Sequence, residues 1–373
     1  MDNATMLLND LAGRYRSVGP MMRGLFLLAV ATSCGGDGVT QPPPTSVAEF
    51  EQRLEELRES HHIPAITAVI SKGQQVVWVK PYGIADRATG RAAADTTVYH
   101  LASLTKPFVA TVLLQLVEEG KVSLDDPVST YGINLSSPAG TVIRVRHLLS
   151  HTSEGTPGTR YAYNGDRFGL VDAVIAQAAG KPLAAALQER IIAPLGLHRT
   201  APNPQSSSFA TSGLDKPTFE ANMARGYTYT LGGYNPTQYP TYFGGAAGLT
   251  SSALDVASFS MALDRDALLQ PATKALAYTP VASPSGQVFP YGLGWFATDY
   301  KGVRIIWHYG LWVANSSLII KVPDRELTFV VLANTDGLSS PYPLGSGRLD
   351  TSPWARAFLD TFVIGSVPLP GAQ

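Results

Sequence analysis

The sequence predicts an α/β fold of the α+β type, in which one antiparallel sheet is flanked by terminal helices and interrupted by a mainly helical insertion. Strand-like stretches lie towards both ends of the chain, at about residues 65–80 and 302–334, and helical patterns lie between them. A pair of strands is not a stable sheet by itself, so the first pair must join the last strands. Hydrophobic residues are 45% of the 373 residues, enough for a sizeable core.

The segment before residue 47 has the features of an export signal and a tether. Arg23 precedes an apolar run at residues 25–30, and small residues lead from it to Cys34. This pattern is typical of a secretory signal, and the run is too short to span a bilayer as a helix. A cysteine directly after the small residues resembles a bacterial lipobox, and a Pro-rich tether follows it. An ordinary signal peptide with a chance cysteine is the alternative.

From this segment we expect an exported protein, a periplasmic or cell-envelope lipoprotein of a bacterium, attached to the membrane through a lipid anchor at Cys34. Residues 1–20 do not resemble a signal, which favours translation from Met21 or Met22.

The first elements of the globular part follow from local spacing. Apolar residues at positions 50, 54 and 57 lie on one face of a helix that begins at about Val47. Residues 65–80 alternate as two strands around a Lys72-Gly73 turn. After a turn-rich loop, residues 103–119 form a helix with a broad apolar face, and Gly120 ends it.

The later elements are predicted in the same way. Helical patterns occur at 144–151, 167–180, 182–192, 252–263 and 353–362, and strand patterns at 302–310, 315–323 and 326–334. Residues 201–247 are rich in Pro, Gly, Ser and Tyr, and a loop of this length is usually functional or mobile. Its tyrosines either wall a substrate pocket or only pack the loop.

These elements divide the chain into a signal and tether at 1–46 and one globular domain at 47–373. Within that domain, 47–102 and 248–373 hold the sheet, and 103–247 is the mainly helical insertion with its long loop.

Composition excludes several classes of function. The net charge is −1 and charged residues are 15% of the chain, so no electrostatic footprint for nucleic acid exists. One cysteine excludes an intrachain disulfide. No glycine-rich loop has the spacing for phosphate or a dinucleotide, and we expect no cofactor. Substrate capture must depend on shape and local groups.

The stretch "HLASLTKPF" places Ser103 and Lys106 three positions apart at a helix start, and this is the only Ser-x-x-Lys in the chain. Residues at i and i+3 share a helix face. A neutral lysine can accept a hydroxyl proton if burial or nearby positive charge lowers its pKa. Pro107 is tolerated only near a helix N-terminus, which agrees with Ser103 at or near the cap. From this local pattern alone, Ser103 can be either a helix-capping residue or a nucleophile.

Several stretches of the sequence resemble blocks of one protein family, and they occur in the same order as in that family. Residues 101–131, together with "IRVRHLLSHTSEG", "PGTRYAYNGDRFGLVDAVI", "GGAAGLTSSALDVASF", "YGLGW" and "WHYG", resemble the serine β-lactamase, DD-peptidase and carboxylesterase superfamily, in the branch near class C β-lactamases. The similarity covers about residues 47–335. It implies the β-lactamase/transpeptidase-like fold and an acyl-enzyme formed on Ser103, with Lys106 as its proton acceptor.

The resemblance implies a second motif, Tyr-x-Asn, which falls on "YNG". Tyr163 matches the family's base or proton shuttle, and the position of the usual asparagine is held by Gly165. Either Asn164 takes over the contact with the lysine and the substrate, or that contact is lost. Its loss weakens recognition of an amide more than attack on a simple ester.

A third motif, Lys-Thr-Gly or His-x-Gly, falls on His308, Tyr309 and Gly310. The resemblance implies that His308 donates to a substrate carboxylate or to the serine–tyrosine network. Gly310 lets the backbone approach the substrate. The matching oxyanion donors are the N–H groups of Ser103 and Leu311, and Trp312 is a candidate for lining the pocket.

We therefore expect a serine hydrolase that acts on a small-molecule ester or a D-amino-acid-type peptide or amide, with β-lactam hydrolysis as a weaker activity. The alternative is a non-catalytic, lipid-anchored penicillin-binding or cell-wall-sensing protein of the same fold. No GxSxG elbow is present, which excludes the usual α/β-hydrolase pattern. His147 and His151 lack the glutamate of an HExxH zinc motif, so we expect no metal site.

Overall fold

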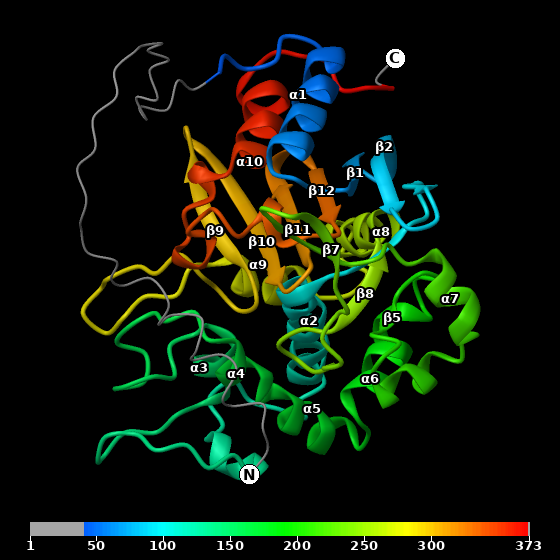
Figure 1. The fold of residues 1–373 in the computed structure, drawn as a ribbon. Helices are drawn as coiled ribbons and strands as arrows, with labels where there is room; N and C mark the ends of the chain where they lie inside the picture. The colour runs from blue at the N-terminus through cyan, green and yellow to red at the C-terminus, as the bar shows by residue number, and fades with distance from the viewer. Residues whose placement is uncertain (1–40, 372–373) are drawn as a thin grey trace, which may run out of the picture. The chain divides into compact units, whose positions relative to one another are not determined.

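The computed structural model describes residues 41–371, and a central antiparallel sheet organises them (Figure 1). Within these residues the central sheet has seven strands in the order β3-β2-β1-β12-β11-β10-β9. Their bounds are β1 (Ala65–Lys72), β2 (Gln75–Asp86), β3 (Arg91–Ala92), β9 (Phe296–Tyr300), β10 (Val303–Trp312), β11 (Asn315–Val322) and β12 (Leu327–Ala333). β1 pairs with β12, Val69 opposite Val330, so strands from both ends of the chain meet at the centre. The predicted fold class is confirmed.

The sheet separates two hydrophobic cores because side chains alternate between its faces. Val69, Val330 and Leu332 contribute to the core shared with the inserted helices. Their neighbours Ile70 and Val331 contribute to the core on the opposite face.

The terminal helices cover that opposite face. α1 (Val47–Ser60) begins where the Ser46 hydroxyl accepts a hydrogen bond from the Glu49 N–H, and it buries its predicted apolar residues. α10 (Pro353–Phe358) packs against α1 and continues into the π-helical turn η9 (Leu359–Ile364) (Figure 1).

The other face carries helices that hold the nucleophile segment. α8 (Ala253–Asp264) packs against β1 and β12, and α2 (Thr105–Glu118) packs against α5 and α6. The remaining helices are α3 (Val145–Leu149), α4 (Gly165–Gly169), α5 (Val171–Ala179), α6 (Leu183–Leu187), α7 (Lys216–Asn222) and α9 (Pro271–Tyr278).

The structure differs from the sequence-based expectation at several elements. β9 and α9 were not predicted, because each is short and has no clear periodic pattern. The segment 201–247 is not one irregular loop: it contains β5 (Ala201–Pro202), α7, and a hairpin of β6 (Tyr227–Thr230) and β7 (Gly233–Pro236). β5 also joins β4 (Val98–His100) and β8 (Leu249–Ser252) in a small separate sheet. β5 pairs with β8, which is distant in sequence, whereas β6 and β7 pair with each other across a tight turn.

The described residues from Pro43 onwards form one compact unit. The predicted boundaries at 47, 103 and 248 remain predictions, and the predicted signal, with Cys34, lies outside the described residues. Within residues 41–371 no single helix is long and apolar enough to cross a membrane; one strongly bent pair, Gly165–Ala179 with Leu183–Ile192, meets the length and composition criteria when both helices are counted together.

Candidate active site

Ser103 lies in a short 3-10 turn, η1 (Ala102–Leu104), directly before α2. The turn replaces the first helical residues expected from the sequence. Ser103 is partly exposed, whereas Lys106, one turn further on, is completely buried. Lys106 Nζ lies 2.8 Å from Ser103 Oγ. A hydroxyl that solvent can reach is therefore paired with an amine that solvent cannot.

Burial changes the chemistry of that amine. It lowers the pKa of Lys106 to about 7, and the carboxylate of Asp166 partly opposes the effect. Lys106 Nζ also donates to the Ala246 carbonyl oxygen at 2.8 Å. Since the ammonium and the free amine are then of similar stability near neutral pH, the amine can take a proton from Ser103.

Tyr163 comes from the loop before α4 and completes the convergence. Its ring centroid lies 5.2 Å from Lys106 Nζ, its side chain is partly buried, and its hydroxyl oxygen is shielded from solvent. Burial raises the pKa of Tyr163 well above its usual value, and the nearby Ser103 hydroxyl opposes this. The hydroxyl makes no hydrogen bond of normal geometry with any described residue. Burial therefore keeps the phenol neutral beside Lys106.

The second motif lacks its amide side chain. A Cβ built on Gly165 would lie 3.9 Å from Lys106 Nζ, so a side chain here would reach the amine. Asn164 does not replace it. Its Oδ1 accepts from the Arg167 N–H at 2.9 Å and caps α4, and its Nδ2 donates to Glu154 at 2.6 Å. Of the two alternatives, these contacts favour loss of the amide contact over its replacement by Asn164.

His308 is buried on β10 and both of its ring nitrogens have partners within the protein. Nδ1 lies 2.7 Å from the Tyr309 carbonyl oxygen and Nε2 lies 2.9 Å from Tyr291 Oη. Burial, with a smaller effect of Lys106, lowers the pKa of His308 well below its usual value. A neutral ring must donate from Nδ1 to the carbonyl and accept at Nε2. His308 therefore holds Tyr291 and offers no free cationic donor to a substrate.

The C-terminal end of β10 lies beside the turn that bears Ser103 and borders the candidate active site. β9 pairs with β10 from Val303 to Trp307, so in the described part of the chain residues 308–312 have no strand partner on that side. A Cβ on Gly310 would lie 2.1 Å from the Leu101 carbonyl oxygen and 2.2 Å from Ser317 Oγ. Glycine is thus required for β10 to approach the turn that bears Ser103.

The two residues after Gly310 lie at the mouth of the site. Leu311 is 38% exposed. The Trp312 ring lies 5.9 Å from Tyr242 and 6.1 Å from His100. Leu311 and Trp312 therefore continue the open edge of β10 beside the nucleophile turn.

Comparison with known proteins agrees with this geometry. The family model described as Beta-lactamase matches residues 50–346. The chain belongs to the beta-lactamase family. Penicillin-binding protein 4* of Bacillus subtilis (strain 168) is 25% identical over 331 residues, covering 76% of this chain and 70% of that protein. Esterase EstB of Burkholderia gladioli is 26% identical over 272 residues, covering 56% of this chain and 67% of the esterase.

Among solved structures, the octameric penicillin-binding protein homologue from Pyrococcus abyssi superposes with a TM-score of 0.72 at 23% identity, over 87% of this chain and 79% of the other. Membership of the beta-lactamase family confirms the predicted superfamily and the predicted enzyme class, a serine hydrolase.

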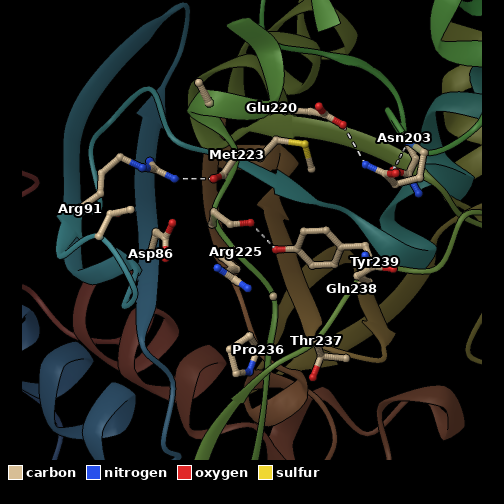
Figure 2. A pocket seen from close by; sticks show the side chains of 15 residues that line it. Asp86, Arg91, Asn203, Glu220, Met223, Arg225, Pro236, Thr237, Gln238 and Tyr239 are labelled. Carbon is tan, nitrogen blue, oxygen red and sulfur yellow. Dashed lines mark hydrogen bonds between the residues drawn. The ribbon is translucent and has the colours of Figure 1, made fainter. Parts of the chain in front are cut away.

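Two cavities in the described part of the chain do not include Ser103 in their lining. One, of about 530 Å³, borders Tyr163 and Tyr161. The other, of about 760 Å³, lies between the β2–β3 end of the sheet and the segment after α7, with Tyr239 in its wall (Figure 2). Of the tyrosines expected to wall a pocket or pack the loop, Tyr239 thus lines a cavity, and Tyr242 faces Trp312.

Several residues at the site carry no motif signal, and the sequence analysis missed them. Tyr291 holds His308 from within the "YGLGW" block. Asp172 accepts the Gly245 N–H at 2.8 Å and so fixes the loop whose Ala246 carbonyl binds Lys106. Burial raises the pKa of Asp172 to about 7. The only available signal was their place inside blocks that resemble the family.

The two histidines considered as metal ligands have structural contacts instead. His151 Nδ1 accepts the Asn164 N–H at 3.1 Å, and His147 Nδ1 accepts the Arg144 N–H at 3.0 Å. Within residues 41–371 no group of three or more His, Cys, Asp or Glu side chains is arranged to hold a metal ion.

Proposed function

We propose that this chain hydrolyses uncharged carboxylic esters through an acyl-enzyme on Ser103, with short D-amino-acid peptides or amides as the second substrate class. The observation that carries the proposal is the 2.8 Å contact between a partly exposed serine hydroxyl and a fully buried lysine amine whose pKa burial lowers to about 7. A buried amine of this kind is a general base beside a nucleophile.

The proposed reaction has two steps. Ser103 Oγ attacks the carbonyl carbon while its proton passes to Lys106 Nζ, and the Tyr163 phenol relays a proton to the leaving oxygen. The N–H groups of Ser103 and Leu311 stabilise the oxyanion, and each such donor typically contributes about 3 kcal/mol. Water then attacks the acyl-enzyme by the same route and releases the acid.

The preference for an uncharged ester follows from what the site offers. His308 is neutral and both its ring nitrogens are engaged, so it supplies no positive charge for a substrate carboxylate. Gly165 supplies no amide to hold a peptide group. The mouth is apolar, since Leu311 and Val313 are 38% and 43% exposed. These features favour an apolar acyl group over a β-lactam or a peptide that ends in a carboxylate.

The proposal is tested with purified wild-type protein and Ser103→Ala. We expect turnover of p-nitrophenyl butyrate, slower release of D-alanine from an N-acylated D-alanyl-D-alanine peptide, and little hydrolysis of nitrocefin. A fluorescent fluorophosphonate should label the wild type and not the variant. If neither turnover nor labelling occurs, the non-catalytic binding protein of the same fold becomes the better interpretation.

We also propose export and lipid anchoring at Cys34, which rest on the sequence of the signal segment. Expressed at full length in a bacterial host, the wild type should fractionate with membranes and incorporate an alkyne-labelled fatty acid. Cys34→Ala should do neither, and a membrane-bound, unlabelled wild type would contradict the anchor.

A further inference from the structure

The residue before the nucleophile has an unusual backbone conformation. Ala102 has φ of +49°, in the left-handed region that residues with a Cβ seldom occupy. Such a conformation persists only where surrounding contacts hold it. The peptide group between Ala102 and Ser103 carries the Ser103 N–H, so whatever fixes Ala102 also fixes the direction of that donor.

Hydrogen bonds hold both peptide groups of Ala102. On one side the Ala102 N–H donates to His100 Nδ1 at 3.0 Å. On the other side the Ala102 carbonyl oxygen accepts from Thr105 Oγ1 at 2.8 Å. Thr105 belongs to α2, which helix packing secures. His100 is therefore the side chain that holds the peptide N–H of Ala102.

The His100 ring is itself held firmly. It is completely buried, lies parallel to the Tyr239 ring with centroids 5.5 Å apart, and meets Trp312 edge-on at 6.1 Å. Tyr239 is fixed in turn, because its hydroxyl donates to the Ala224 carbonyl oxygen at 2.7 Å in the wall of the larger cavity (Figure 2). Burial lowers the pKa of His100 to about 4, so the neutral ring keeps a lone pair on Nδ1 for the Ala102 N–H.

We propose that His100 is a positioning residue for acyl transfer: by accepting the Ala102 N–H it holds the Ala102–Ser103 peptide so that the Ser103 N–H points at the developing oxyanion. The inference rests on the proposed function. A residue that only filled the core would contribute through its volume, whereas this role requires an acceptor atom at the place of Nδ1.

The test compares three variants of the full chain. His100→Leu keeps much of the volume and removes the acceptor. His100→Asn is smaller but can place Oδ1 where Nδ1 lies. His100→Leu combined with Ala102→Gly removes the cost of the left-handed backbone, because glycine adopts positive φ readily. His198→Leu, at an exposed histidine outside the site, is the matched control.

We expect His100→Leu to lower kcat for p-nitrophenyl butyrate by about 10- to 100-fold with KM changed less than about twofold, because small misplacements of a catalytic group cost this much. The rate of fluorophosphonate labelling should fall in parallel. His100→Asn should retain most of kcat although it leaves the larger void, and Ala102→Gly should restore part of the activity lost in His100→Leu. His198→Leu should match the wild type.

If His100→Asn is as inactive as His100→Leu or less active, and the losses of kcat follow the losses of melting temperature, the inference is overturned in favour of packing alone. If His100→Leu does not fold, His100→Gln serves instead, since its acceptor lies one bond too far, and activity equal to that of His100→Asn would refute the role. A wild type that neither turns over ester nor reacts with fluorophosphonate refutes the proposed function, and the positioning role falls with it.

Discussion

Replacing Lys106 by methionine should abolish catalysis and stabilise the fold, and the stabilisation should depend on pH. The variant keeps the length of the buried chain and removes its amine. Burial lowers the pKa of Lys106 from 10.5 to about 7. Between these values the unfolded chain binds more protons than the folded one at this position, so folding is penalised, and wild-type stability rises with pH as the penalty disappears.

The size of the stabilisation follows from the difference between the pKa values of Lys106 in the unfolded and folded states. Each pKa unit corresponds to about 1.36 kcal/mol, so the charged lysine costs the folded state about 4 to 5 kcal/mol at pH 7 and about 1 kcal/mol at pH 9.5. The variant also leaves the Ala246 carbonyl oxygen without its 2.8 Å donor, a loss of about 1–3 kcal/mol that does not vary with pH. At pH 7 we expect a net gain of about 2 kcal/mol for Lys106→Met.

The assay is urea unfolding of both proteins from pH 7 to pH 9.5. The stability of Lys106→Met relative to the wild type should fall by about 3 kcal/mol over this range, from about +2 to about −1 kcal/mol, because the pH-independent terms cancel in the comparison. Lys121→Met removes the same charge from an exposed lysine, whose surface ion pair with Glu119 contributes little to stability, and is the control for net charge. Parallel profiles for the wild type and Lys106→Met would refute the argument, since Lys106 would then keep its proton in the folded protein and could not act as the base.

Three further predictions concern the same site. Ester hydrolysis should rise about tenfold per pH unit below pH 7 and level off above it, as the buried Lys106 amine loses its proton, and a kcat/KM profile that is flat from pH 5.5 to 8 would contradict this. Gly310→Ala should lower kcat at least 100-fold and the melting temperature by several degrees, because its Cβ would overlap the Leu101 carbonyl oxygen; unchanged kinetics would mean that the β10 contact is dispensable. Gly165→Asn should raise nitrocefin hydrolysis relative to ester hydrolysis, since the new amide reaches Lys106 Nζ, and an unchanged ratio would show that this position does not select substrates.

The sequence by itself determined the elements that depend on neighbours along the chain. Residues 50, 54 and 57 specify the buried face of α1, and the apolar alternation at 65–80 and 303–333 specifies five strands of the sheet. The pairing of β1 with β12 was also predictable, because an isolated strand pair has no partner for its buried face. The Ser103–Lys106 contact required only a helix turn, since i and i+3 are neighbours on any helix.

Tertiary structure alone decided how the site is completed. Asn164 points away from Lys106 because it caps α4, and His308 is neutral because Tyr291 and a backbone carbonyl occupy its nitrogens. The acceptor that holds Ala102 and the carbonyl that binds Lys106 come from residues without any motif. Burial, hydrogen-bond partners and pKa values arise from side chains brought together across the fold, and local spacing carries no information about them.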